Sequence, residues 1–285
     1  MIDHEARKSR LGASEVAAIL GENPDMTPLE VWEVKTGRRA HFEGNEHTRR
    51  GNRQEQSILD WLEEDLGYHY TVERNVAPFH YGETIAWATP DGIICYHPQP
   101  SGPDSDMVAG AEAKSTLKRI KDIEEIPTTW IIQCQWGMMC TGLKVWHLAI
   151  HGPMVCDYQR FPIHADEKLQ AELLALATKW WEKHIVGDVQ PEPINTADVL
   201  HLWPIDNGDI IEAVPTLAEA IERYKELGKE ITDKTKEREA LKDRITPAIG
   251  GASMVTYMGQ KLATYKYQAR AAYSVEAGGG RVLRV

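Results

Sequence analysis

Hydrophobic and polar residues in the first quarter of the chain recur at three- and four-residue intervals, a spacing typical of amphipathic helices. Three helices are predicted there, at residues 15–20, 28–36 and 46–66. Ser14 is the expected N-cap of the first helix, and Thr27 with Glu30 has the capping-box spacing at the start of the second. In the third helix, Ile58 and Leu62 share one apolar stripe, which predicts that this helix packs on a core.

After residue 70 the pattern changes to the alternation and β-branched content typical of strands. Strands are predicted at residues 70–76, 84–89, 92–97, 109–116, 145–151 and 155–161. The segment Thr89-Pro90-Asp91-Gly92 predicts a tight turn between the second and third of these strands. A helix at 129–139 precedes the fifth strand, and a helix at 165–184 follows the last one. Together these elements predict one α/β domain over residues 1–187.

The rest of the chain has a different character. Residues 188–210 are rich in Pro, Asp and Asn and are predicted to form a linker or an ordered tether. Residues 211–285 are predicted to form an extension with a helix at 216–245 and a hairpin at 254–267. Apolar residues occupy heptad a and d positions of this helix, interrupted by two basic residues: Leu217, Ala220, Tyr224, Leu227 and Ile231, then Lys234 and Arg238, then Leu241 and Ile245. Such a seam usually packs on the parent domain or on a neighbouring subunit, so the extension is predicted to serve packing or oligomerisation.

The composition excludes several classes of protein. The 285 residues are 42% hydrophobic and 26% charged, which argues against wholesale disorder. No run of about 18 apolar residues occurs and the first residues contain no apolar signal segment, so a membrane span and export are not expected and a cytoplasmic location is predicted. The four cysteines form no CxxC pair, which argues against a zinc or disulfide framework.

Charge adds a constraint on partners. The chain has 43 acidic and 32 basic residues, giving a net charge of −11, which argues against coating nucleic acid through bulk positive charge. A locally basic cleft or an acidic metal site remains compatible with this balance. Several basic residues crowd into the first fifth of the chain: Lys8, Arg10, Arg38, Arg39, Arg49, Arg50 and Arg53.

Three charged residues interrupt segments of small or apolar residues and carry the candidate chemistry. Asp91 lies in the predicted turn, and Glu112 and Lys114 lie in the strand 109–116, where alternation places both side chains on one side. The two carboxylates, with the Ala113 carbonyl, are hard oxygen donors suited to Mg²⁺, and Lys114 would lie beside the attacking water or the phosphate. A Pro-Asp-Gly turn and an exposed Glu–Lys pair are each common without function, but their combination indicates metal-assisted phosphodiester hydrolysis.

Two further polar residues are candidates for the same site. Glu55 shares a helix face with Ile58 and Leu62, and a carboxylate on a buried face needs a partner such as a metal site. Alternatively, Glu55 is a partly exposed residue at the margin of the apolar stripe, without a role in a site. Gln133 and Gln135 lie among apolar residues, where amides either cap buried backbone or orient a site, and Gln133 is the preferred site member.

The order of the motifs is more specific than any one of them. They are Arg10-Leu11-Gly12-Ala13-Ser14-Glu15-Val16, Thr27-Pro28-Leu29-Glu30-Val31-Trp32 through Lys35-Thr36-Gly37, Gly51-x-x-x-Glu55, Thr89-Pro90-Asp91-Gly92, Glu112-Ala113-Lys114, and Gln133-Cys134-Gln135 leading to Thr141-Gly142. In this order the chain resembles the YqaJ-like viral recombinase family, the group of lambda-type exonucleases and related alkaline nucleases within the PD-(D/E)xK nuclease superfamily. The resemblance covers roughly the first 150 residues.

The resemblance implies a restriction-endonuclease-like core, with a central mixed β-sheet flanked by helices, and cleavage of DNA with Mg²⁺ or Mn²⁺. The resemblance implies that Asp91, Glu112 and the Ala113 carbonyl bind the metal and that Lys114 activates water. It also implies that Glu55 is the family's helical acid near the metal and that Gln133 is its helical glutamine. Arg7, Arg10 and Ser14 fall in the segment that binds the 5′-phosphate in lambda-type enzymes, and arginine suits a terminal phosphate.

The resemblance also implies partners. Lambda-type members digest one strand of linear duplex DNA from the 5′ end, form trimers, and work with a single-strand annealing protein in recombination. A homo-oligomer that acts on double-stranded DNA ends, encoded by a phage or prophage, is therefore expected.

Three alternatives remain open from the sequence. An endonuclease of the same superfamily would use the same chemistry. A Cas4- or RecB-like nuclease shares the motifs, but many of these carry an iron–sulfur cluster on closely spaced C-terminal cysteines, whereas Cys156 is the last cysteine here. A non-catalytic DNA-end-binding protein could use the heptad helix as its working surface, but it would have no need of Asp91, Glu112 and Lys114.

Overall fold

The protein is described by a computed structural model covering residues 8–40, 44, 46–98, 105–154, 157–269, 281 and 283. The chain forms two compact units, Met1–Val199 and Leu200–Val285.

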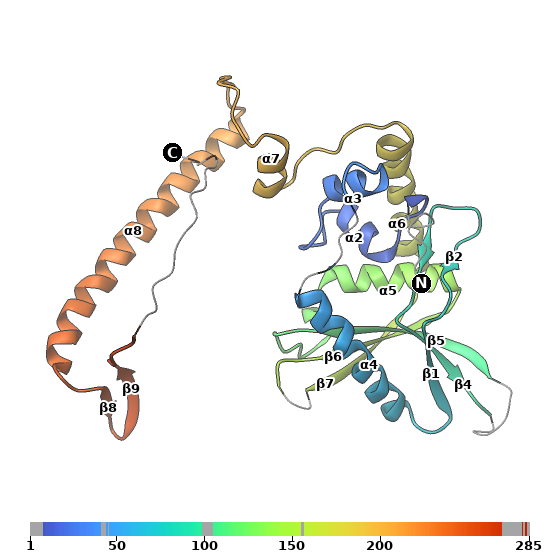
Figure 1. Ribbon diagram of the computed structural model, residues 1–285, viewed down its shortest axis with the longest axis horizontal. Coiled ribbons are helices and arrows are strands. Elements are labelled where there is room, and N and C mark those ends of the chain that lie inside the picture. The colour runs from blue at the N-terminus through green and yellow to red at the C-terminus, as the bar shows by residue number, and fades with distance from the viewer. Residues whose placement is uncertain are drawn as a thin grey trace. The chain divides into compact units, whose positions relative to one another are not determined.

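A five-stranded sheet forms the centre of the first unit (Figure 1). Its strands, in spatial order, are β1 (Tyr70–Arg74), β4 (Gly92–Tyr96), β5 (Asp106–Ser115), β6 (Val145–His151) and β7 (Tyr158–His164). β5 and β6 run parallel, and all other neighbours run antiparallel. A parallel pair needs a crossover, which contains the short helix η1 (Ile123–Glu125) and α5 (Thr128–Thr141). The expected mixed sheet in an α/β fold is confirmed.

Helices cover both faces of this sheet. α4 (Glu46–Leu66) packs on one face through Ile58, Leu59 and Leu62, which are almost completely buried. α5 covers the other face, where Met138 packs in one cluster with Leu148. The remaining helices of this layer are α2 (Ala13–Ile19) and α6 (Glu167–Trp181), which pack on α5, and α3 (Pro28–Lys35), which packs on α2. The π-helix η2 (Glu182–Val186) continues α6.

Close approach of α5 to the sheet depends on two glycines and two tryptophans. The Trp146 ring lies between Gly110 of β5 and Gly137 of α5, where an added Cβ would come within 2.2 Å and 2.6 Å of ring carbons. On α5, the Trp136 indole donates hydrogen bonds to the carbonyl of Trp87 (3.0 Å) and to that of Leu11 (3.3 Å). These contacts fix the helix against the strand that carries the candidate site.

The expected N-cap of the first helix is wrong. α2 begins at Ala13 after the cap residue Gly12, so Ser14 lies inside the helix. The helix therefore starts two residues earlier than expected, and the Glu15 carboxylate accepts a hydrogen bond from the Gly12 N–H (2.7 Å) at this start.

The expected strand at 84–89 is mostly absent. Only β3 (Trp87–Ala88) forms, and it pairs with β2 (Phe79–His80) in a separate two-stranded sheet. The reason is competition from Leu11, whose N–H donates to the Ile85 carbonyl (2.8 Å) and whose carbonyl accepts from Trp87 N–H (3.2 Å). The last strand lies three residues later than the expected 155–161, of which residues 155 and 156 lie outside the described residues.

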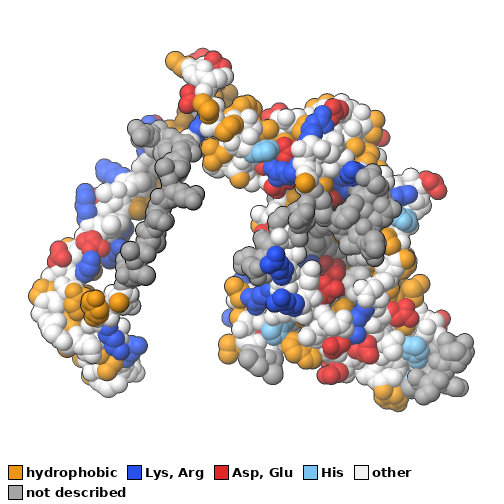
Figure 2. All heavy atoms as spheres, in the orientation of Figure 1, with side chains coloured by type: hydrophobic (Ala, Val, Ile, Leu, Met, Phe, Trp, Pro, Cys, Tyr) orange, Lys and Arg blue, Asp and Glu red, His pale blue; other side chains and the backbone are white. Residues whose placement is uncertain are grey.

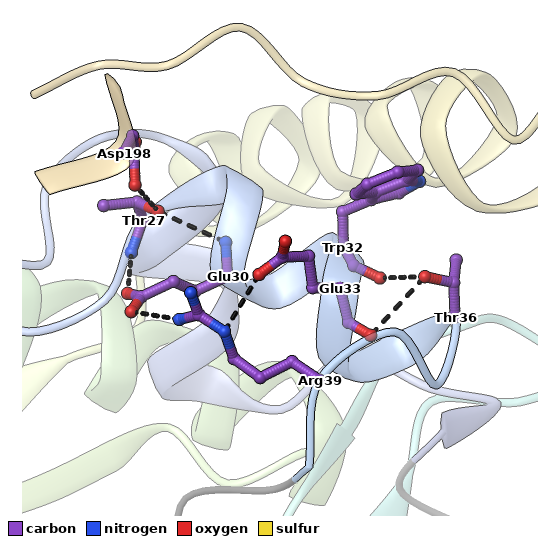
Figure 3. A network of polar contacts seen from close by, with 7 residues as sticks. All are labelled: Thr27, Glu30, Trp32, Glu33, Thr36, Arg39 and Asp198. Carbon is purple, nitrogen blue, oxygen red and sulfur yellow. Dashed lines mark hydrogen bonds and ion pairs between the residues drawn. The ribbon is translucent and has the colours of Figure 1, made fainter. Parts of the chain in front are cut away.

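Residues 188–199 of the expected linker belong to the first unit, where Asp198 lies against Thr27 (Figure 3). Asp198 is 3% exposed, and its carboxylate accepts hydrogen bonds from the Thr27 hydroxyl (2.9 Å) and the Ile194 N–H (3.1 Å). An ion pair joins Arg38 to Asp188 at 2.8 Å. The division between the units falls within α7 (Thr196–Leu202).

The second unit contains α8 (Pro215–Ile249) and a hairpin of β8 (Met254–Tyr257) and β9 (Gln260–Thr264). None of its described residues from 200 to 269 is buried. The apolar heptad residues of α8 are exposed by 40% or more: Leu217, Tyr224, Leu227, Ile231, Leu241 and Ile245. Nowhere in the described chain is there a helix with the length and apolar character needed to cross a lipid bilayer.

Candidate active site

Asp91 lies directly before β4, and the sheet register fixes its position. Gly92 pairs with Ala111 of β5, so Asp91 lies beside Glu112. Glycine is needed at position 92, because a Cβ there would come within 2.6 Å of a side-chain carbon of β1. The Asp91 carboxylate accepts a hydrogen bond from the Ala113 N–H (2.9 Å). The turn side chain is thereby tied to the end of β5.

Glu112 and Lys114 project from β5 on the same side. Their register opposite Leu148 and Ile150 places them on the sheet face that α5 covers. The Lys114 Nζ lies 2.6 Å from the Glu112 Oε1, and these side chains are 20% and 13% exposed. The ion pair is therefore largely shielded from water but still reachable from the cleft.

Glu55 reaches the same place from α4. The helix is held one turn later by buried Ile58, and Glu55 faces a cleft of about 630 Å³ over the end of β5. The cleft lining combines α4 with β5 and the turn before β4, chiefly Gly51, Asn52, Glu55, Asp91, Glu112 and Lys114. The structure thus brings Asp91, Glu112, Lys114 and Glu55 together, with Ala113 beside them.

Burial and mutual repulsion shape the charges in this cleft. Burial, and next the charge of Glu112, raise the pKa of Asp91 well above its ordinary value. Burial and the charge of Glu112 also raise the pKa of Glu55. For Lys114, burial lowers the pKa, but attraction to Glu112 and Asp91 outweighs it and the net pKa is raised, so the ammonium form persists.

The residues fit a divalent cation. Three carboxylates face the ammonium group of Lys114, so two negative charges within this set of four side chains are uncompensated when all are ionised. In the described part of the chain no three His, Cys, Asp or Glu side chains are arranged to hold a metal ion by themselves. Mg²⁺ commonly binds through one or two carboxylates plus water and substrate phosphate, so Asp91, Glu112 and the Ala113 carbonyl are a suitable donor set.

α5 contributes the wall beneath these groups. Burial, followed by the charge of Glu112, raises the pKa of the Cys134 thiol well above its ordinary value, so this turn of α5 borders the site. The neighbouring Gln133 is partly buried, and its Oε1 is buried without a hydrogen-bond partner among the described residues. Gln135 has a structural role, since it forms hydrogen bonds to His164 at the end of β7, to Asp166, which is the N-cap of α6, and to Gln170 of α6.

Two of the three residues expected at a 5′-phosphate site, Arg10 and Ser14, do not line the cleft. The Arg10 guanidinium donates to the Thr84 carbonyl (2.8 Å), and the Arg10 carbonyl accepts from the Lys35 ammonium (2.6 Å). Ser14 is exposed on α2. Neither residue is among those that line the cleft, and Arg7 lies outside the described residues.

Two acidic residues of the cleft lining were not expected from the sequence. Asp25 is exposed in the loop before α3, and Glu30 lies in its first turn. The Glu30 carboxylate accepts from Thr27 N–H (3.0 Å) and pairs with Arg39 at 2.5 Å (Figure 3). The capping box accounts for a glutamate at position 30 by local helix structure alone. The sequence pattern therefore did not indicate that Glu30 faces a cleft.

Exonucleases are among the solved structures that this chain matches. The alkaline exonuclease LHK-Exo from Laribacter hongkongensis is 17% identical, with a TM-score of 0.49 over 64% of this chain and 91% of that one. A phage-related exonuclease from Haemophilus somnus 129PT is 15% identical, with a TM-score of 0.45 over 63% of this chain and 96% of that one. A comparison with curated proteins found no match.

The sequence also matches a family model, that of the YqaJ-like viral recombinase domain, over residues 4–144. The matched region contains Glu55, Asp91, Glu112 and Lys114, which converge in the cleft. Over residues 4–144, the chain belongs to the YqaJ-like viral recombinase family.

Proposed function

We propose that the protein is a metal-dependent exonuclease that hydrolyses phosphodiester bonds of linear double-stranded DNA in phage-type recombination. The observation that carries the proposal is the convergence of Asp91, Glu112, Lys114 and Glu55 in one open cleft, within a domain of the recombinase family. This set combines hard oxygen donors with a cation, which is what phosphodiester hydrolysis requires.

In this proposal the chain's own groups divide the work. Asp91, Glu112 and the Ala113 carbonyl hold Mg²⁺ or Mn²⁺, which when bound polarises the phosphate. Lys114, kept as an ammonium by Glu112, orients the attacking water and offsets the charge that develops on the phosphate. Glu55, with its raised pKa, accepts hydrogen bonds from water on the α4 side of the cleft.

Digestion of matched DNA substrates tests this proposal. Linear duplex, closed circular duplex and single strands of the same sequence are incubated with Mg²⁺, Mn²⁺ or EDTA. Loss of linear duplex only in the presence of metal is expected. Cleavage of closed circles would instead favour an endonuclease, and inertness of every substrate with both metals would contradict the proposal and favour the non-catalytic DNA-end-binding alternative.

The expected direction is 5′ to 3′, from a phosphorylated end. Arg10 lies one residue before Leu11, whose backbone bonds fix it beside β3. Together with Arg7 and Ser14 it is proposed to bind the terminal phosphate, so Arg10→Ala should reduce the preference for 5′-phosphorylated over 5′-hydroxyl ends. Duplexes labelled at either end report direction and end preference together; equal wild-type rates on both kinds of end would contradict this assignment.

Association through α8 is proposed for the second unit. A two-stranded hairpin and a helix without a core are marginal on their own, and no described residue from 200 to 269 is buried. A homo-oligomer, with a trimer as the expected form, would cover the apolar heptad seam; a single-strand annealing protein is the expected further partner. Light scattering of the full chain and of its Ile231→Asp variant tests the proposed homo-oligomer. The variant is expected to have a smaller mass than the wild type, and a monomeric wild type would exclude the homo-oligomer.

A further inference from the structure

Three aromatic side chains form a partly exposed group beside the cleft, which we call the aromatic shelf. They are Trp61 of α4, His151 at the end of β6 and Tyr158 at the start of β7. The Trp61 ring centroid lies 5.2 Å from that of His151 and 6.1 Å from that of Tyr158. All three residues are partly exposed, so a ligand in solution can reach the shelf.

Strand register places the shelf next to the cleft, on the face of the sheet that α4 covers. His151 pairs with Tyr158 on one side and with Ser115 on the other, and Ser115 lines the cleft. Neighbouring strands are about 4.8 Å apart, so His151 lies one strand away from the cleft. On α4, Trp61 comes three residues after the cleft-lining Ile58, or about 60° around the helix. The shelf therefore adjoins the cleft without covering the reacting groups.

Packing of the core does not account for the shelf. Trp61 is not part of the buried apolar cluster under α4, and Tyr158 packs only at the margin of that cluster. The His151 Nδ1 and the Tyr158 hydroxyl are buried without a hydrogen-bond partner among the described residues, which is unfavourable for polar atoms. Burial, and next the charge of Asp65, raise the pKa of Tyr158, so its hydroxyl stays neutral and able to donate. The shelf thus combines ring surface with unused hydrogen-bonding groups.

Charge alone does not explain attraction of DNA to this part of the molecule. Figure 2 shows both basic and acidic side chains where α4 lies in Figure 1, and the whole chain has a net charge of −11. Stacking of a nucleobase on an aromatic ring does not need a positive charge, and every base has a π-face that can stack. Aromatic rings beside the cleft therefore supply an attraction for DNA that the overall charge does not.

The shelf suits an unpaired base better than a paired one. A base inside a duplex has both faces covered by its neighbours, and a paired end offers only the outer face of its last pair. An unpaired base offers both faces and also its Watson–Crick edge, which carries hydrogen-bond donors and acceptors. The unused polar atoms of His151 and Tyr158 are suitable partners for such an edge.

We propose that Trp61, with His151 and Tyr158, stacks an unpaired base of the strand that is being digested, next to the phosphate at Lys114. The inference rests on the proposed function in taking DNA as the substrate. In this arrangement the strand end separates from its complement before it is cut, and the shelf replaces the stacking that the base loses. The three residues hold the substrate and take no part in the bond that breaks.

Binding of two matched duplexes tests this inference. One duplex is fully paired and the other has mismatched pairs at its ends, and both carry 2-aminopurine, whose fluorescence falls on stacking, at both termini of one strand. Measurement in EDTA avoids hydrolysis. The wild type should bind the mismatched duplex more tightly than the paired one and quench its 2-aminopurine. Trp61→Leu should lower the affinity for the mismatched duplex by about 5- to 150-fold, as for loss of one stacked base, and reduce the quenching.

Further variants separate stacking from a structural role. Trp61→Phe keeps an aromatic ring and should retain most of the preference for the mismatched duplex. Trp203→Leu is the matched control, because it removes a tryptophan that is 50% exposed in the second unit, and it should bind both duplexes as the wild type does. If Trp61→Leu does not fold, His151→Leu gives the same test, since it removes the ring beside Trp61 and should lower the same preference.

The outcomes separate this inference from the proposed function. Unaltered binding and quenching in Trp61→Leu and His151→Leu, or an equal loss of affinity for both duplexes, would overturn the inference and leave the nuclease activity standing. Failure of the wild type to digest any DNA would overturn the proposed function, while a lost preference for the mismatched duplex in EDTA would still support the shelf. A wild type that binds neither duplex would overturn both.

Discussion

Asp91→Asn should make the protein more stable and inactive, because the wild-type carboxylate is held where its charge is disfavoured. Burial and the charge of Glu112 raise the Asp91 pKa, so ionising Asp91 in the folded state costs about 1.4 kcal/mol for each pKa unit of the shift. Asparagine is nearly isosteric, and its carbonyl oxygen can still accept the hydrogen bond from Ala113 N–H. Relief of a shift of one pKa unit would raise Tm by about 3–6 °C for a folded domain of the size of the first compact unit.

The sign of the effect depends on pH and metal. The unfolded chain ionises Asp91 near its ordinary pKa, so the wild type loses stability as pH rises from that value to the raised folded pKa, whereas the variant does not. The advantage of asparagine should therefore be present at neutral pH in EDTA and disappear on acidification. Saturating Mg²⁺ should reverse the order, because a ligand at a hundred times its Kd stabilises the wild type by about 2.7 kcal/mol and the variant lacks a ligand group.

Thermal unfolding followed by circular dichroism measures both effects, in EDTA and in Mg²⁺, at acidic and neutral pH. Asp122→Asn removes the same charge at an exposed position without a side-chain cap bond, and should behave as wild type. A lower Tm for Asp91→Asn than for wild type in EDTA at neutral pH, or equal stabilisation of both proteins by Mg²⁺, would refute this reasoning.

Other substitutions test the site and its support. Lys114→Ala should reduce turnover of linear duplex DNA by about 10²- to 10³-fold and leave DNA affinity in EDTA nearly unchanged. The control variant Lys118→Ala, at an exposed position, should digest DNA at the wild-type rate. Wild-type turnover by the Lys114 variant would remove this residue from the mechanism. Gly110→Ala should destabilise the first unit by about 1–3 kcal/mol in urea unfolding, because the new Cβ would lie 2.2 Å from a Trp146 ring carbon. Gly228→Ala meets nothing within 4 Å on α8 and should increase helicity, with a gain of about 0.5–1 kcal/mol; a loss would show that this position is packed in the protein as it exists in solution.

Local signals in the sequence predicted most elements of the first unit. The Thr27 hydroxyl accepts from Glu30 N–H (3.2 Å) and the Glu30 carboxylate accepts from Thr27 N–H, as the capping-box spacing implies. The helix at 46–66 and the strand at 145–151 begin and end where the pattern places them. Alternation along β5 placed Glu112 and Lys114 on one side, and their side chains form an ion pair.

Features that depend on contacts between residues far apart in the sequence could not be predicted from local patterns. Competition from Leu11 removed most of the strand expected at 84–89. The cleft lining includes Asp25 because the loop before α3 and the start of α4 meet in space, and no spacing along the chain encodes that meeting. The ion pair of buried Lys35 with Glu15 at 2.8 Å likewise joins two helices.

The central claim is that Asp91 and Glu112 bind a divalent cation next to Lys114. Diffraction from crystals grown with Mn²⁺, collected at a wavelength where manganese scatters anomalously, tests this claim most directly. An anomalous peak within bonding distance of both carboxylates, lost in crystals of Asp91→Asn, is the predicted result. Crystals of a protein that digests DNA with Mn²⁺, but show no manganese at these two residues, would contradict it.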